Sequence, residues 1–167
     1  VREALRYARE PIGAGEVWRL LSGHFVHLGW RHFLMNAIAL LLIWALVGNR
    51  LTSVQWVLAF AVIVGGIDAG FWFIDRQLVW YVGLSGVLHG LLLAGLLAGW
   101  RENRGEALLL IVLMLAKLLY EQLVGPLPGS EASAGGAVVV NAHLYGALAG
   151  LVAAGLITVR AGRPASI

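Results

Sequence analysis

Long apolar runs alternate with short polar stretches along most of the chain. Each run approaches the roughly 20 residues with which an α-helix crosses the hydrocarbon core of a bilayer. Polar or glycine-containing segments end the runs, as at Gly48-Asn49-Arg50 and Arg101-Glu102-Asn103-Arg104. The pattern therefore predicts five membrane-spanning helices, at about residues 30–47, 54–74, 84–100, 107–124 and 138–159.

Two segments outside these runs have a different character. Residues 1–29 carry four arginines and three glutamates, which is too polar for a membrane span, and they predict an external loop region with short helices. Residues 125–137 contain two prolines and four glycines and predict a flexible loop, which we expect to cap the functional site. The chain is thus expected to form one membrane domain over residues 1–167, with its helices within residues 30–160.

Composition supports an integral membrane protein of the all-α class. Hydrophobic residues make up 60% of the 167 residues and charged residues 13%, with a mean hydropathy of +0.83. Cysteine is absent, which excludes disulfides and thiolate metal sites. The net charge is only +3, and arginines flank the apolar runs without forming a patch, so the expected partner is the lipid bilayer and no nucleic acid.

The positions of the arginines predict how the chain is oriented. Positive residues in short loops remain on the cytoplasmic side. Arg76 is then the external exception, and residues 1–29 lie outside as well. An external N-terminal segment needs a preceding span, so we expect a sixth helix upstream of Val1. The arginines that this orientation places inside are Arg50, Arg101, Arg104, Arg160 and Arg163.

The clearest candidate for chemistry is Ser85, in Gly83-Leu84-Ser85-Gly86 at the start of the third apolar run. It is not the nucleophile elbow Gly-x-Ser-x-Gly, because residue 87 is valine. The first N–H groups of a helix lack intrahelical partners and can face a developing negative charge. Alone, the motif is equally typical of a pair of glycines that pack helices together.

Other polar residues are predicted at the same membrane depth as Ser85. Helices of alternating direction bring the starts of the first, third and fifth spans to one face, where His32, Asn36, Ser85 and His143 lie. Polar groups inside a membrane are costly and indicate a functional site. A dyad would use His143 first as general base and then as general acid. The Ser85 N–H, His32 and Asn36 would bind the oxyanion.

Two spacings favour this assembly. His32 and Asn36 are four residues apart and share one helix face. The third and fifth spans each carry a pair of glycines four residues apart, which allows close backbone approach between them. That approach would bring His143 to Ser85. The glycines concerned are Gly86, Gly90, Gly146 and Gly150.

Taken together, four motifs resemble the rhomboid intramembrane serine proteases. They are Glu16-Val17-Trp18-Arg19, His27-Leu28-x-x-x-His32-x-x-x-Asn36, Gly83-Leu84-Ser85-Gly86 and Ala142-His143-x-x-Gly146-x-x-x-Gly150. The resemblance implies a six-helix core, a Ser-His dyad, a transmembrane protein as substrate and no cofactor beyond water. It also implies that Trp18 and Arg19 brace the external loop.

The longer form Gly83-Leu84-Ser85-Gly86-Val87-Leu88-His89-Gly90 resembles the rhombosortase branch of that family. This branch is associated with secreted bacterial proteins that end in Gly-Gly, an apolar helix and a basic tail. The resemblance implies cleavage of such tails near their glycines, at the periplasmic face of the bacterial inner membrane. Transfer to an amine acceptor, as in protein sorting, remains open beside hydrolysis.

Several residues carry more than one interpretation. His24 and His27 are interpreted as structural residues that hold the external loop, with substrate contact as the alternative for His27. His89 either orients substrate or bonds within the bundle. Asp68, Lys117 and Glu121 are interpreted as pairing residues. The five histidines could instead ligate a metal or haem, although no His-Glu-x-x-His occurs and the carboxylates are expected away from the histidine-rich helix starts. A noncatalytic rhomboid-like binding protein is the other alternative, but it would be expected to lack the serine or histidine.

Overall fold

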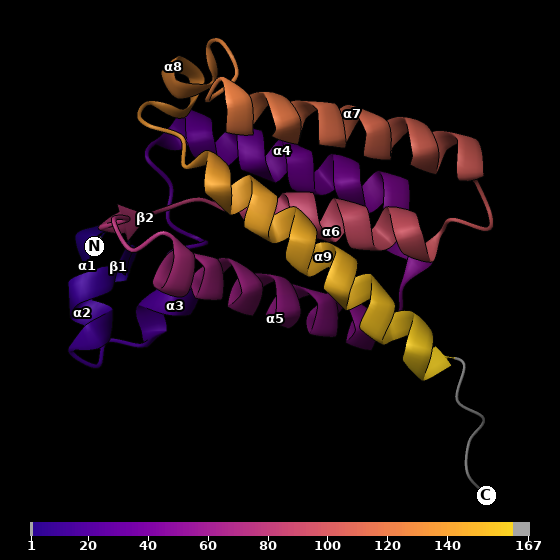
Figure 1. The fold of residues 1–167 in the computed structure, drawn as a ribbon, viewed down its shortest axis with the longest axis horizontal. Coiled ribbons are helices and arrows are strands. Elements are labelled where there is room, and N and C mark those ends of the chain that lie inside the picture. Colours follow the sequence, from indigo (N-terminus) through magenta and orange to yellow (C-terminus); the bar gives the residue numbers. More distant parts are fainter. Residues whose placement is uncertain (1, 162–167) are drawn as a thin grey trace, which may run out of the picture.

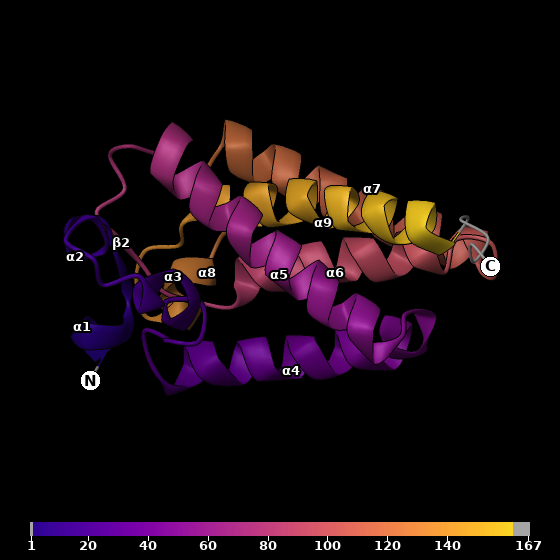
Figure 2. The same cartoon turned by 90° about the horizontal axis from the view of Figure 1, so that it is seen from below.

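The computed structural model describes residues 2–161, with side chains to residue 157, and consists of a bundle of long helices (Figures 1 and 2). This confirms the predicted all-α polytopic bundle. Arg163 lies outside the described residues, as does the side chain of Arg160. The five long helices are α4 (Trp30–Val47), α5 (Ser53–Ala69), α6 (Ser85–Ala98), α7 (Arg104–Leu123) and α9 (Val140–Ala161).

The helices differ in how well they suit a membrane crossing. Within residues 2–161, three are both long and apolar enough, namely Trp30–Arg50, Ser53–Ile74 and Val140–Ile157. The first continues from α4 into the 3-10 helix η1 (Gly48–Arg50), and the second from α5 into the π-helical η2 (Gly70–Ile74). The fourth predicted span, α7, carries Lys117 and Glu121 near its end.

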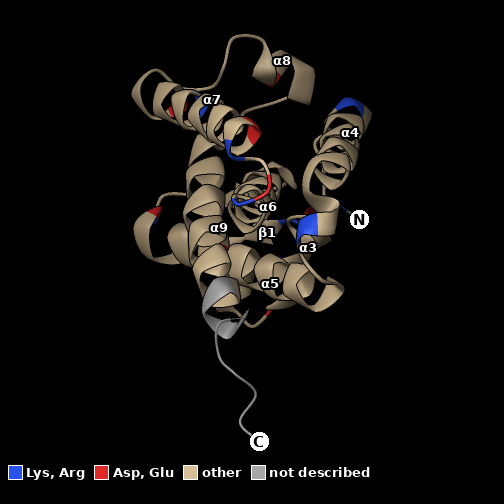
Figure 3. Cartoon of the chain, turned by 90° about the vertical axis from the view of Figure 1, so that its right-hand side faces the viewer, with Lys and Arg blue, Asp and Glu red and all other residues tan. Residues whose placement is uncertain are grey.

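Helix α6 is shorter than the sequence predicts. Its 14 residues cover about 21 Å, whereas the hydrocarbon core is about 30 Å thick. One end of α6 must therefore lie inside the hydrocarbon layer. The helix can be this short because it contacts α4, α5, α7 and α9, which surround it when the bundle is seen end-on (Figure 3).

Glycines determine how closely α6 packs against α9. A Cβ added at Gly86 would lie 2.6 Å from the carbonyl oxygen of Ala142, and one added at Gly90 would lie 2.5 Å from that of Gly146. A Cβ on Gly146 would overlap the carbonyl of Gly86. Backbone thus meets backbone along this interface, which is the close approach that small residues permit between membrane helices.

The outer surfaces of the bundle are apolar. Large hydrophobic side chains stay exposed on the faces of α4 and α7 that point away from the other helices, as expected for contact with lipid tails. Charged residues are few along the helices and appear mainly near their ends (Figure 3). Examples of exposed residues are Leu41, Leu42, Trp44, Leu109, Leu113, Leu119 and Leu123.

The starts of α4, α6 and α9 lie at one end of the bundle, which we call the site end (Figure 1). Here residues 2–22 form α1 (Arg2–Leu5), β1 (Tyr7–Ala8), α2 (Arg9–Gly13) and α3 (Trp18–Ser22). Strand β1 pairs antiparallel with β2 (Trp80–Tyr81), a contact that the sequence does not predict. The Arg9 guanidinium donates to the carbonyls of Trp72 and Asp75, at 3.3 and 3.2 Å, and so ties this region to the end of α5 and η2.

Residues 125–137, predicted as a flexible loop, contain a short helix, α8 (Ser130–Ala134). The sequence pattern did not predict this helix. Gly129 and Gly135 bound the helix with φ angles of 79° and 80°, a conformation that glycine adopts without the steric cost of a Cβ. Helix α8 lies at the site end, beside the start of α4 (Figure 1).

Candidate active site

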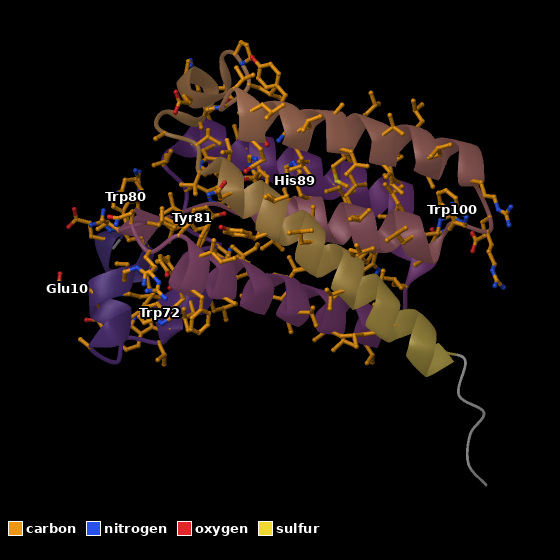
Figure 4. The ribbon with its side chains drawn as sticks, viewed as in Figure 1. Glu10, Trp72, Trp80, Tyr81, His89 and Trp100 are labelled. Carbon is orange, nitrogen blue, oxygen red and sulfur yellow. The ribbon has the colours of Figure 1, made fainter. Side chains whose placement is uncertain are left out.

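Ser85 is the first residue of α6 and is half buried. The turn before it depends on Gly83, whose φ of +129° is rarely adopted by other residues. The hydroxyl of Tyr81 donates to the Gly83 carbonyl at 2.5 Å. Burial raises the pKa of Tyr81, so that its hydroxyl keeps the proton that it donates. This turn connects β2, which contains Tyr81 (Figure 4), to the start of α6 at Ser85.

His143, in the first turn of α9, contacts the serine. Its Nε2 lies 2.9 Å from Ser85 Oγ, within hydrogen-bond distance. The close packing of Gly86 against Ala142 explains this contact. Gly86 directly follows Ser85 in the chain, and Ala142 directly precedes His143. His143 itself is buried.

His89 lies one helical turn after Ser85 and faces the same site. Its ring stacks on the ring of His143, with 4.4 Å between centroids and 22° between planes. Its Nδ1 lies 2.7 Å from the Ser85 carbonyl oxygen and must donate to it. Figure 4 shows His89 inside the bundle. Of the two interpretations of His89, bonding within the bundle is therefore the one for which the structure gives a contact.

The end of α7 supplies two charged residues to the site. Glu121 Oε2 lies 2.9 Å from Nδ1 of His143, and Glu121 Oε1 lies 2.7 Å from Nζ of Lys117. The expected pairing of Lys117 with Glu121 is present. However, the expectation that carboxylates lie away from the histidines was wrong, because α7 runs toward the site end and finishes there. That direction was available from the alternation of the spans.

The predicted oxyanion residues, His32 and Asn36, are buried and line one cavity with Ser85. The N–H of Leu28 donates to Nδ1 of His32 at 3.3 Å, which leaves the ring proton on Nε2. That edge of the ring faces Gly83, where an added Cβ would lie 3.2 Å from Nε2. Asn36 Nδ2 lies 3.2 Å from the carbonyl oxygen of His32.

The cavity beside Ser85 has a volume of about 190 Å³. The helices α4, α6, α7 and α9 contribute polar residues to its wall, and the segment that contains α8 contributes mainly apolar ones. Residues 125–137 therefore form part of the cavity wall, and their role as a cap stays a prediction. The lining residues from this segment are Leu127, Ser130, Ala134 and Ala137.

The match with known families agrees with this arrangement. The family model described as the Rhomboid domain matches residues 14–160, which is most of the chain. The chain belongs to the rhomboid family. Members of this family are in general intramembrane serine proteases that act on transmembrane substrates. Neither the comparison with curated proteins nor the comparison with solved structures gave a match.

Trp18 and Arg19, which the sequence analysis singled out, lie on α3 at the site end. Arg19 is buried; its guanidinium donates to the Glu16 carboxylate and, at 2.6 Å, to the carbonyl of Glu3. Trp18 stays half exposed, and its Nε1 lies 3.4 Å from the carbonyl oxygen of Ala4. Both residues thus connect α3 to α1.

The two remaining histidines, His24 and His27, make their hydrogen-bond and ring contacts with residues other than Ser85 and His143. His24 is buried, with Nε2 3.3 Å from Oδ1 of Asp68 on α5. His27 packs edge-on against His32 and Phe33, and burial lowers the pKa of His27. The described residues contain no group of three histidine or carboxylate side chains arranged to hold a metal ion.

Proposed function

We propose that this rhomboid protein is an intramembrane serine endopeptidase in which Ser85 is the nucleophile and His143 the general base. The observation that carries the proposal is the 2.9 Å contact between His143 Nε2 and Ser85 Oγ, made inside a bundle of apolar helices. A serine hydroxyl is a weak nucleophile until an adjacent base takes its proton. The pair has the geometry that this activation requires.

The proposed reaction has two halves. First, Oγ attacks the carbonyl carbon of the scissile bond while its proton passes to Nε2 of His143. The tetrahedral intermediate then collapses, the C–N bond breaks, and His143 gives the proton to the leaving amine. Water next attacks the acyl-enzyme ester and gives its proton to His143, which returns it to Oγ as the ester bond breaks.

The oxyanion of the tetrahedral intermediate needs donors that already point toward it. We propose that the backbone N–H of Ser85, the Nε2–H of His32 and the amide of Asn36 supply them. The bond from Leu28 N–H to Nδ1 of His32 supports the second donor, since it leaves the ring proton at Nε2. The N-terminal position of Ser85 on α6 supports the first, because that N–H has no intrahelical partner.

For the substrate, we propose a membrane-anchored helix that is cut near its outer end. A cavity of about 190 Å³ beneath α8 suits small residues at the cleavage site. Together with the motif at residues 83–90, this supports C-terminal sorting tails with Gly-Gly before the apolar helix. The cluster of Arg50, Arg101 and Arg104 at the opposite end supports a periplasmic site end in a bacterial inner membrane.

The proposal is tested by labelling the detergent-solubilised protein with a fluorophosphonate, which reacts with activated serines. We expect labelling of the wild type that is lost in Ser85→Ala and His143→Ala and unaffected by a chelator. His24→Ala serves as a matched histidine control and should still be labelled. If the folded wild type is not labelled, or if labelling persists in Ser85→Ala, the proposal is wrong.

A further inference from the structure

Glu121 is a buried carboxylate with two polar partners. Its side chain is 2% exposed, and it lies in the last turn of α7, at the same end of the bundle as Ser85. One carboxylate oxygen, Oε2, lies 2.9 Å from Nδ1 of His143, and the other, Oε1, lies 2.7 Å from Nζ of Lys117. A mechanism that uses only Ser85 and His143 assigns no role to either of these contacts.

The protons of the site can be assigned from these distances. To take the hydroxyl proton of Ser85, Nε2 of His143 must be unprotonated, so the neutral ring carries its proton on Nδ1. The Nδ1–H group then donates to Glu121 Oε2. The Lys117 ammonium lies 3.3 Å from Nδ1 but cannot donate to a protonated nitrogen, so it donates to Glu121 Oε1. Each polar side-chain atom of His143, Glu121 and Lys117 thus acts as a donor or as an acceptor without conflict.

We propose that Glu121 is a positioning residue that turns the dyad into a Ser85–His143–Glu121 triad, with Lys117 holding the Glu121 carboxylate in place. This inference rests on the proposed function. Glu121 selects the tautomer of His143 that leaves Nε2 free, and it stabilises the imidazolium that forms when Ser85 loses its proton. The carboxylate remains ionised throughout and takes no proton.

The environment makes this electrostatic effect strong. Glu121 and His143 are both buried, and charges interact more strongly there than in water. A buried carboxylate alone would be unfavourable, but Lys117 supplies the opposite charge. The other titratable groups that face the ring are His89 on α6 and His32 on α4, neither of which can supply a negative charge. Among the described residues, Glu121 is the carboxylate that contacts His143.

The chain provides a matched control. His24 and Asp68 form a second buried histidine–carboxylate contact, at 3.3 Å, which lies outside the cavity beside Ser85. Glu121→Gln and Asp68→Asn each remove one negative charge and keep the side-chain shape. Both variants should be purified as full chains, together with Glu121→Asp, and their thermal unfolding compared with that of the wild type.

The readout is the second-order rate of fluorophosphonate labelling as a function of pH. For Glu121→Gln we expect a fall of about 100-fold near pH 7, within the range for loss of a group that assists proton transfer. Its acid limb should also move to lower pH, because an imidazolium without a facing carboxylate loses its proton more readily. Glu121→Asp should recover part of the rate, and Asp68→Asn should keep the wild-type profile.

Three outcomes separate this inference from the proposed function. If the wild type is labelled at Ser85 and Glu121→Gln keeps both its rate and its acid limb, Glu121 is no triad member and the dyad stands alone. A slower Glu121→Gln with an unmoved acid limb and a matching loss of folded protein would likewise overturn the inference, since a structural defect would explain it. If the folded wild type is unlabelled, the proposed function fails first.

Discussion

Two buried histidines in this molecule each contact a carboxylate on another helix, but their second ring nitrogens have different surroundings. In His143, Nδ1 contacts the Glu121 carboxylate and Nε2 contacts Ser85 Oγ. In His24, Nε2 contacts the Asp68 carboxylate, and Nδ1 has no hydrogen-bond partner among the described residues. A histidine–carboxylate contact is therefore not a catalytic feature in itself. In the proposed mechanism the difference is that the second nitrogen of His143 faces the Ser85 hydroxyl.

The carboxylates differ as well. Glu121 is shared between His143 and the Lys117 ammonium. Within the described residues, Asp68 has no lysine or arginine within 4 Å and pairs with His24. The His24 pair links the segment after α3 to α5, whereas the His143 pair links α9 to α7 beside Ser85. The same pair of chemical groups thus joins segments at one place and, in our proposal, supports the nucleophile at the other.

Replacing the two histidines in turn should separate these roles most clearly. We expect His143→Asn to lower the rate of Ser85 labelling by about 1,000-fold or more, because the general base is lost. His24→Asn should lower it only as far as the folded fraction falls. Labelling rates normalised to folded protein measure the difference. Equal losses in both variants would mean that His143 has no chemical role.

The comparison also depends on the close packing that brings His143 to Ser85. Gly146→Ala would push a methyl group into the Gly86 carbonyl and should destabilise the fold by about 1–3 kcal/mol. We expect labelling to fall about 100-fold, since a displacement near 1 Å disrupts catalytic geometry. Gly155→Ala, on the same helix, is the control, because its Cβ would meet no described atom of a neighbouring helix within 4 Å. A wild-type rate in Gly146→Ala would contradict this account of the packing.

Lys117→Met should have a smaller effect with a distinct signature. The Glu121 carboxylate would lose its ammonium partner and rely on His143 alone, and we expect labelling to slow about 10-fold. Removing a positive charge near the ring favours the imidazolium, so the acid limb should move to higher pH, opposite to Glu121→Gln. A pH–rate profile of the variant measures this. A shift to lower pH would contradict the charge assignment.

His89→Phe should have the smallest effect. Phenylalanine keeps a ring against His143 but loses the donor to the Ser85 carbonyl. We expect labelling to slow by about two- to fivefold, in line with the loss of roughly one neutral hydrogen bond. His89→Ala, which also removes the stacked ring, should be slower than His89→Phe. The reverse order of rates would show that the stacking does not position His143.

Sequence reasoning located the elements of this fold better than its packing. The apolar runs gave α4, α5 and α9 nearly at their observed bounds. The glycine spacings predicted that α6 and α9 pack together, because small residues on one helix face allow two backbones to approach closely. The predicted third span is longer than α6, because it includes Leu84, which caps the start of the helix, and Gly99 and Trp100, which form the turn after its last residue.

The contact of Glu121 with His143 could not be predicted from the sequence. The sequence shows Lys117 and Glu121 one turn apart, which is also the pattern of an ordinary surface pair. Whether they face lipid, one another or α9 depends on the rotation of α7 about its own axis. That rotation is set by packing with α6 and α9, which no local pattern in α7 reveals. The β1–β2 contact was missed because two-residue strands leave no periodicity.

The most direct test of the central claim is cleavage of a helix within a bilayer. The full chain would be reconstituted in liposomes with a reporter that carries Gly-Gly, an apolar helix and a basic tail. We predict two fragments, identified by mass spectrometry, that arise from one cut near the glycines and whose formation requires Ser85. An intact reporter beside folded protein whose Ser85 reacts with fluorophosphonate would contradict the proposed substrate. Equal cleavage by Ser85→Ala would contradict the claim that Ser85 is the nucleophile.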